Sequence, residues 1–170
     1  LGDVSGKGVN AALLMAKTSS LFRGLGKRID QPGELLAQIN IELCETSIHG
    51  MFVTLVAGIY DPKTGLLKLV NAGNPPALLF TPEGLAREIE AGAPPLGVLE
   101  DTVFPEIVLN LGDNSLYIFS DGVTEGYTEN GETLGLSGLF KTIATMPEQL
   151  TAHQRIERIV KRIRHDAQSL

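Results

Sequence analysis

The sequence contains very little cysteine and histidine. Its 170 residues include one cysteine, three histidines and no tryptophan. A single cysteine cannot form a disulfide within the chain, which excludes a disulfide-stapled fold and leads us to expect a reducing, cytoplasmic location. Apolar runs are short as well. None approaches the roughly 18 residues that a membrane-spanning helix needs, so we expect no membrane segment in this chain.

The scarcity of histidine excludes two classes of catalytic site. His49, His153 and His165 show no spacing typical of a zinc site, and we expect each of them at the surface. A Ser-His-Asp hydrolase needs a G-x-S-x-G turn, which the sequence does not have; residues 2–6 read GDVSG. Zinc chemistry and an activated serine are therefore both disfavoured.

Charge and composition favour an ordinary globular domain. The net charge is −6 and the sequence pI is about 5.0, so a nucleic-acid partner is not expected. Apolar residues make up 43% of the chain and charged residues 20%, which is enough apolar material for a core. The length suits one domain.

Hydrophobic periodicity predicts that helices and strands are segregated along the chain. Helices are expected over 9–28, 137–145 and 147–166. A further helix is expected from about residue 32, with Asp30 as its cap. Strands are expected over 51–60, 66–71, 77–80, 85–90, 102–109 and 115–119. Strands grouped between helices indicate an α+β fold. Cys44 falls on a helix, where a small buried core residue is a better interpretation than a nucleophile.

A glycine-rich segment at residues 1–8 (LGDVSGKG) is the first candidate site. Its glycines allow a tight turn around Asp3, whose carboxylate could bind a hard cation together with backbone carbonyl oxygens. Two other interpretations stay open. Residues 6–11 also fit the dinucleotide pattern G-x-G-x-x-A, although no strand is predicted before them, and the segment could be a simple turn that caps a helix.

Asp121 is the second candidate. It follows the apolar run 117–119, and the rigid end of a strand is a suitable place for a metal-binding carboxylate. The alternative is an ordinary Asp-Gly turn. Carboxylates and glycines without a histidine cluster favour oxygen ligands, and hence Mg²⁺ or Mn²⁺.

Taken together, the motifs resemble the SpoIIE/RsbU-type phosphatases, the bacterial branch of the PPM (metal-dependent protein phosphatase) superfamily. The matching segments occur in the family's order: GDVSGKG with AALLM at 2–8 and 11–15, FVTL at 52–55, VNAGNPP at 70–76, PLG at 95–97 and SDGVTE at 120–125. The resemblance implies a PPM-type αββα sandwich of two antiparallel sheets flanked by helices.

The resemblance also implies a site and a reaction. Asp3 would bridge two Mn²⁺ or Mg²⁺ ions, the carbonyl of Val4 would be a further ligand, and Asp121 would bind one ion. A metal-activated water would hydrolyse phosphoserine or phosphothreonine on a regulatory protein. In this family that protein is commonly a phosphorylated anti-sigma-factor antagonist with a STAS domain.

Two expected parts of the family pattern do not appear in the sequence. We expect residues 1–170 to be a single phosphatase domain that lacks the N-terminal strand pair and the C-terminal Asp-Asp strand, with Asp166 at the surface. An upstream sensory domain would belong to the parent chain, and a homodimer is possible. The alternative function is a catalytically incomplete, phosphatase-like module that binds a phosphoprotein without turnover.

Overall fold

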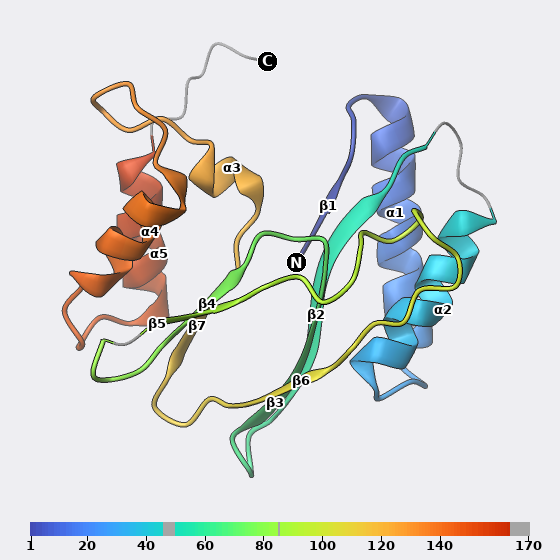
Figure 1. Ribbon diagram of the computed structural model, residues 1–170, viewed down its shortest axis with the longest axis horizontal. Helices are drawn as coiled ribbons and strands as arrows, with labels where there is room; N and C mark the ends of the chain where they lie inside the picture. Colours follow the sequence, from blue (N-terminus) through green and yellow to red (C-terminus); the bar gives the residue numbers. More distant parts are fainter. Residues whose placement is uncertain (46–49, 85, 164–170) are drawn as a thin grey trace.

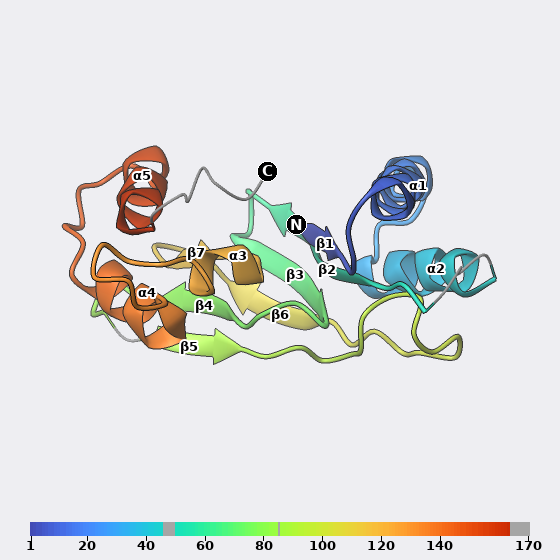
Figure 2. The ribbon, with the colours of Figure 1, turned by 90° about the horizontal axis from the view of Figure 1, so that it is seen from above.

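Two antiparallel sheets lie between two pairs of helices, as Figure 1 shows. The computed structural model describes residues 1–45, 50–84 and 86–163. Seen from above in Figure 2, α1 and α2 lie on one side of the strands and α4 and α5 on the other. The predicted α+β class and the αββα order of layers are both confirmed.

The first sheet has the strand order β1-β2-β3-β6 and is covered by two helices. Its strands are β1 (Gly2–Val4), β2 (Val53–Asp61), β3 (Leu66–Ala72) and β6 (Ile107–Asn110), and its helices are α1 (Val9–Leu25) and α2 (Pro32–Cys44). The helix residues Leu36 and Ile39 are fully buried against Val53 and Val70. The predicted hairpin over 51–71 is β2 and β3, paired from Leu55–Ala72 to Asp61–Leu66.

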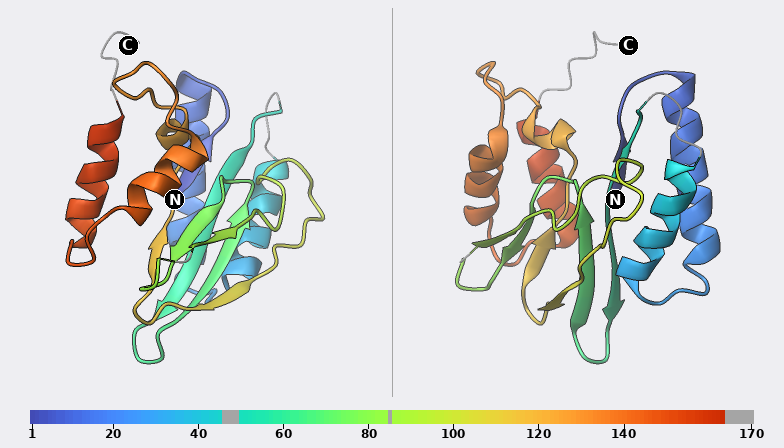
Figure 3. Two further views of the ribbon diagram at one scale, coloured as in Figure 1. Left: turned by 60° about the vertical axis from the view of Figure 1, so that its left-hand side comes forward. Right: turned by 45° about the vertical axis from the view of Figure 1, so that its right-hand side comes forward.

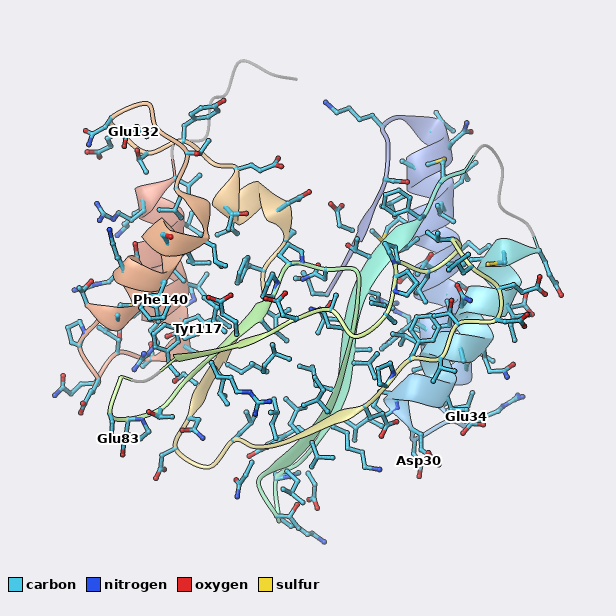
Figure 4. The ribbon with its side chains drawn as sticks, in the orientation of Figure 1. Asp30, Glu34, Glu83, Tyr117, Glu132 and Phe140 are labelled. Atoms are coloured by element: carbon cyan, nitrogen blue, oxygen red, sulfur yellow. The ribbon has the colours of Figure 1, made fainter. Side chains whose placement is uncertain are left out.

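The second sheet has the order β5-β4-β7. It consists of β5 (Ala86–Ile89), β4 (Ala77–Phe80) and β7 (Ser115–Tyr117), and it is covered by α4 (Gly135–Ala144) and α5 (Ala152–Arg162). Phe80 joins sheet and helix, because its ring lies 5.6 Å from that of Tyr117 and 5.4 Å from that of Phe140. Tyr117 and Phe140 are labelled in Figure 4.

A third group of apolar side chains fills the space between the sheets. Val56 and Leu69 contribute from the first sheet, and Ala77 and Ile89 from the second. Burial on both faces explains why the strands have continuous apolar runs rather than strict alternation. Antiparallel sheets without βαβ units also exclude the dinucleotide-binding interpretation of residues 6–11.

Two sequence-based expectations about strands were wrong. Residues 2–4 are a strand, β1, and not only a loop, because they pair with Val53–Leu55 of β2. The expected strand 102–109 is limited to β6, since residues 102–106 lie against the start of α2 instead: a Cβ on Gly33 would come within 2.5 Å of the Phe104 carbonyl oxygen. Pro105 within that segment also lacks the N–H that a strand uses for pairing.

Two expectations about helices were also wrong. Asp30 does not cap α2, whose N-cap is Gln31 and has no side-chain hydrogen bond. The last helix begins at Ala152 rather than Pro147, because Thr151 and Gln154 form a capping box that fixes its start. Asp166 and His165 lie outside the described residues. No helix in the described part of the chain has the length and apolar character to cross a membrane.

Candidate metal-binding site

Asp3 is placed by the edge strand β1. The strand pairs Asp3 with Thr54 of β2, and the Asp3 side chain is exposed. Its Oδ1 accepts a hydrogen bond from the N–H of Val4 at 2.9 Å. The chain then leaves the strand through Ser5 and Gly6, where Ser5 exchanges backbone and side-chain hydrogen bonds with Phe52. Strand pairing on one side and this turn on the other therefore fix the backbone around Asp3.

Asp121 reaches the same region from the second sheet. It is the first residue of a short helix, α3 (Asp121–Thr124), that follows β7 by way of Phe119 and Ser120. The sequence predicted a metal-binding carboxylate at a strand end, with an ordinary Asp-Gly turn as the alternative. In the structure Asp121 begins one turn of helix, closed by Glu125 N–H donating to the Asp121 carbonyl oxygen. Figure 1 shows α3 and β1 at the same end of the molecule. The β2–β3 turn lies at the opposite end, as Figure 3 shows.

One cavity of about 460 Å³ brings the candidate residues together. It is lined by Asp3, Val4, Ser5, Gly6, Phe52, Thr54, Gly73, Asn74, Pro75 and Asp121. Both carboxylates and the residue whose carbonyl was expected as a ligand, Val4, are in this lining. The sequence motifs centred on residues 2–8, 52–55, 70–76 and 120–125 are therefore neighbours in space, although they are far apart along the chain.

The turn between β3 and β4 forms the wall between the two carboxylates. Asn71 and Asn74 are its buried polar residues, with exposed fractions of 2% and 3%. Asn71 holds the turn internally: its Oδ1 accepts from Asn74 N–H at 3.0 Å, and its Nδ2 donates to the carbonyls of Asn74 and Pro75. Asn74 reaches out of the turn, donating from Nδ2 to the Phe119 carbonyl at 2.9 Å.

Gly73 in this turn packs closely against Pro95, the first residue of the PLG motif. Gly73 has a φ of +71°, and a Cβ there would lie 2.4 Å from Pro95 Cγ. Only glycine fits such a position without strain. Leu96 in turn exchanges two backbone hydrogen bonds with Val53, whose β1 partner is Val4. The PLG motif therefore supports the cavity from behind and does not line it.

The Oδ1 atom of Asn74 is buried, and no donor in the described part of the chain hydrogen-bonds to it. The orientation of the amide is determined by its other atom, because Nδ2 faces the two carbonyl oxygens of Phe119 and Pro75. The sequence placed Asn74 in the motif VNAGNPP but gave it no role, because its contact with Phe119 is 45 positions away in the chain.

The donors in the cavity suit a hard divalent cation. The lining includes the carboxylates of Asp3 and Asp121 and the hydroxyls of Ser5 and Thr54, with no histidine or cysteine among the described lining residues. Mg²⁺ is commonly held by one or two carboxylates with the remaining positions taken by water. Within residues 1–45, 50–84 and 86–163, no group of three or more His, Cys, Asp and Glu side chains forms a metal site. The two carboxylates in the cavity suit Mg²⁺ or Mn²⁺ only if water or other groups fill the remaining coordination positions.

The other candidate residues lie elsewhere. Cys44 is the last residue of α2 and only half-buried; burial and the nearby Glu100 carboxylate raise the pKa of its thiol, which opposes a role as nucleophile. His153 is exposed on α5 beside Glu157, as expected for a surface residue. His49 lies outside the described residues.

Comparison with known proteins agrees with this fold and site. The phosphoserine phosphatase RsbU of Bacillus subtilis is 28% identical over 133 residues, covering 77% of this chain and 40% of RsbU. The RsbU and RsbW domains of a Mycobacterium tuberculosis protein superpose with a TM-score of 0.71 at 26% identity, over 93% of this chain and 43% of that one. The PP2C phosphatase domain of SpoIIE from Bacillus subtilis gives 0.74 at 18% identity, over 94% and 48%.

The fold is thus the αββα sandwich of two antiparallel sheets that these solved phosphatase domains share. The model of the stage II sporulation protein E (SpoIIE) family matches residues 1–169, so the chain belongs to the SpoIIE family, the SpoIIE/RsbU-type branch. The chain spans less than half the length of the curated relatives it matches.

Proposed function

We propose that the chain hydrolyses phosphoserine or phosphothreonine on a regulatory protein in a metal-dependent reaction. The observation that carries this proposal is the shared cavity: Asp3 lines it from β1 of the first sheet, together with Val4, and Asp121 lines it from α3, which follows β7 of the second sheet. Membership of the SpoIIE family and the similarity to RsbU support the reaction class. Residues 1–170 would be one phosphatase domain, with the remaining expected ligands contributed by flanking segments of the parent chain.

In this mechanism the residues of the chain would bind the metal ions and keep the ligands in position. Asp3, the Val4 carbonyl and Asp121 would bind two Mn²⁺ or Mg²⁺ ions, and the antiparallel pairing of β1 keeps the first of these carboxylates in place. Two such ions, when bound, lower the pKa of a water so that hydroxide forms near neutral pH. Ser5 lines the cavity, but the described lining residues include no histidine or lysine to activate its hydroxyl, so hydrolysis without a covalent enzyme intermediate is the better interpretation.

The reaction is tested by substituting the two carboxylates. We expect Mn²⁺-dependent hydrolysis of a phosphoserine peptide and of p-nitrophenyl phosphate. Asp3→Ala and Asp121→Ala should each lower the rate by more than about 100-fold, because loss of a residue that only orients a metal ligand already costs about 10–100-fold. His153→Ala, on the exposed face of α5, is the control and should leave the rate unchanged. Absence of metal-stimulated hydrolysis in the full-length parent protein would contradict the proposal.

The proposed substrate is a phosphorylated anti-sigma-factor antagonist or a similar phosphoprotein. Support comes from the resemblance to RsbU-type phosphatases and from the acidic charge of the chain, which favours a protein over a nucleic-acid partner. Release of phosphate from the phosphorylated antagonist, followed by mass spectrometry, should exceed release from an unrelated phosphoprotein. Equal rates on both would argue against this substrate. A cytoplasmic location, an upstream sensory domain and a homodimer belong to the same proposal.

A binding module without turnover is the alternative. It is favoured by one observation, namely that the described residues contain no cluster of three metal-binding side chains. Calorimetry separates the two functions: partner binding without Mn²⁺ uptake would favour the module, and Mn²⁺ uptake that is lost in Asp121→Ala would favour the enzyme.

A further inference from the structure

The segment before Asp121 is joined to the β3–β4 turn by one buried side chain. Asn74 donates a hydrogen bond from Nδ2 to the carbonyl oxygen of Phe119 at 2.9 Å, two residues before Asp121. The same Nδ2 lies 3.2 Å from the carbonyl oxygen of Pro75. Asn74 is 97% buried, and its backbone is itself fixed by Asn71. Asn71 thus fixes the backbone of Asn74, and the side chain of Asn74 in turn holds the segment 119–121.

The position of the turn gives this bond a consequence for the site. The turn leaves β3 directly after Ala72, which pairs with Leu55 in the sheet that also carries Asp3. Phe119 follows β7, in the other sheet. A bond from Asn74 to Phe119 therefore connects the two sheets where each delivers a carboxylate to the cavity.

We infer that Asn74 is a positioning residue for Asp121, acting through the Phe119 carbonyl and setting where the Asp121 carboxylate lies relative to Asp3. The inference rests on the proposed metal-dependent function. The geometry of Nδ2 supports it: the buried amide donates to the Phe119 carbonyl oxygen at 2.9 Å, a bond that an apolar side chain of the same size could not form.

The test compares donor-removing with donor-preserving variants. Asn74→Ala removes the bond. Asn74→Asp keeps the shape but places an oxygen against two carbonyl oxygens, and Asn74→His can still donate from its ring N–H. The matched control is Asn40→Ala. The fully buried Asn40 also donates from Nδ2 to two carbonyls, those of Leu99 and Glu100, and its Oδ1 accepts from the N–H of Gly97, so this variant loosens the PLG segment and leaves the bond to Phe119 in place.

The first readout needs no metal. Hydrogen exchange at the amide of Glu125, which donates to the Asp121 carbonyl, reports how firmly α3 is held. We expect exchange at least about tenfold faster in Asn74→Ala and Asn74→Asp than in the wild type, near the wild-type rate in Asn74→His, and unchanged in Asn40→Ala. Wild-type exchange in both donor-removing variants would overturn the inference. If Asn74→Ala does not fold, the isosteric Asn74→Asp decides the question.

The second readout is Mn²⁺ affinity by calorimetry. Loss of a partner that orients a metal ligand weakens binding by about 10–100-fold, and we expect this for Asn74→Ala and Asn74→Asp with recovery in Asn74→His. Tighter binding in Asn74→Asp would overturn the inference, because the side chain would then act as a ligand through its charge. If the wild type binds no Mn²⁺, the proposed function fails while the exchange measurement still decides the role of Asn74.

Discussion

Single residues decide how closely the segments around the cavity approach one another. Asp3 and Asp121 carry the proposed chemistry. The flanking glycines and the apolar strand made them candidates, and their place in the ordered family motifs suggested their role as metal ligands. Gly73 and Asn74 have a different part in the site: one permits close approach to Pro95 and the other bonds to Phe119. Their importance follows from contacts with residues 22 and 45 positions away, which no local pattern can indicate.

Gly73→Ala should be strongly destabilising for two reasons. The φ of +71° is left-handed, which costs a non-glycine residue about 1–2 kcal/mol, and the new Cβ would collide with Pro95. We expect a loss of at least about 2 kcal/mol in the free energy of unfolding, measured by urea denaturation. Gly84→Ala is the control, since Gly84 has a φ of +79° and no atom within 4 Å of its would-be Cβ. Equal losses in both variants would show that the contact with Pro95 is unimportant.

At the scale of elements, helix ends depend on partners that are distant in sequence. The start of α2 illustrates this, because the N–H of Gly33 donates to Glu106 Oε1 at 3.0 Å, across 73 positions. The sequence suggested Asp30 as the cap since aspartate before a helix usually has that role. For α5 the local signal was sufficient, as Thr151 and Gln154 form a capping box within three residues.

Glu106→Ala should therefore destabilise the protein more than Asp30→Ala. Loss of a side-chain cap costs about 1 kcal/mol, and we expect that for Glu106 and close to zero for Asp30. Glu106→Gln keeps an acceptor oxygen and removes only the exposed 3.9 Å ion pair with Lys68, so it should retain most of the stability. Thermal unfolding of the three variants checks the order. A larger effect at Asp30 would contradict the assignment.

At the scale of the whole molecule, the proposed site lies where the two sheets meet. Each sheet has its own helix pair and its own apolar core, and a third apolar group joins the sheets. A ligand that contacts both Asp3 and Asp121 would connect the two halves. Binding to the folded state alone must raise the stability of that state.

Mn²⁺ is accordingly expected to stabilise the protein against heat. At 100 times the dissociation constant the gain is about 2.7 kcal/mol, which corresponds to a rise in Tm of about 5–10 °C for a chain of this size. Asp3→Asn and Asp121→Asn should each abolish the rise, whereas Asp101→Asn, an exposed carboxylate outside the cavity, should leave it intact. Scanning calorimetry with and without Mn²⁺ makes the measurement. If the Mn²⁺-induced rise in Tm persisted in both Asp3→Asn and Asp121→Asn, the ion would bind outside this cavity.

The sequence by itself indicated the class of fold and most of the strands, and it suggested Asp3 and Asp121 as metal ligands, which stays a prediction. Alternating and continuous apolar runs, turn residues and glycine-flanked aspartates are local signals, and local physics is sufficient to interpret them. Only the tertiary structure decided that Asp3 and Asp121 line one cavity, that residues 2–4 are a strand, that Glu106 caps α2 and that Asn74 holds the segment before Asp121. Each of these depends on two segments brought together by sheet pairing and core packing, and such long-range contacts leave no periodic trace in the chain.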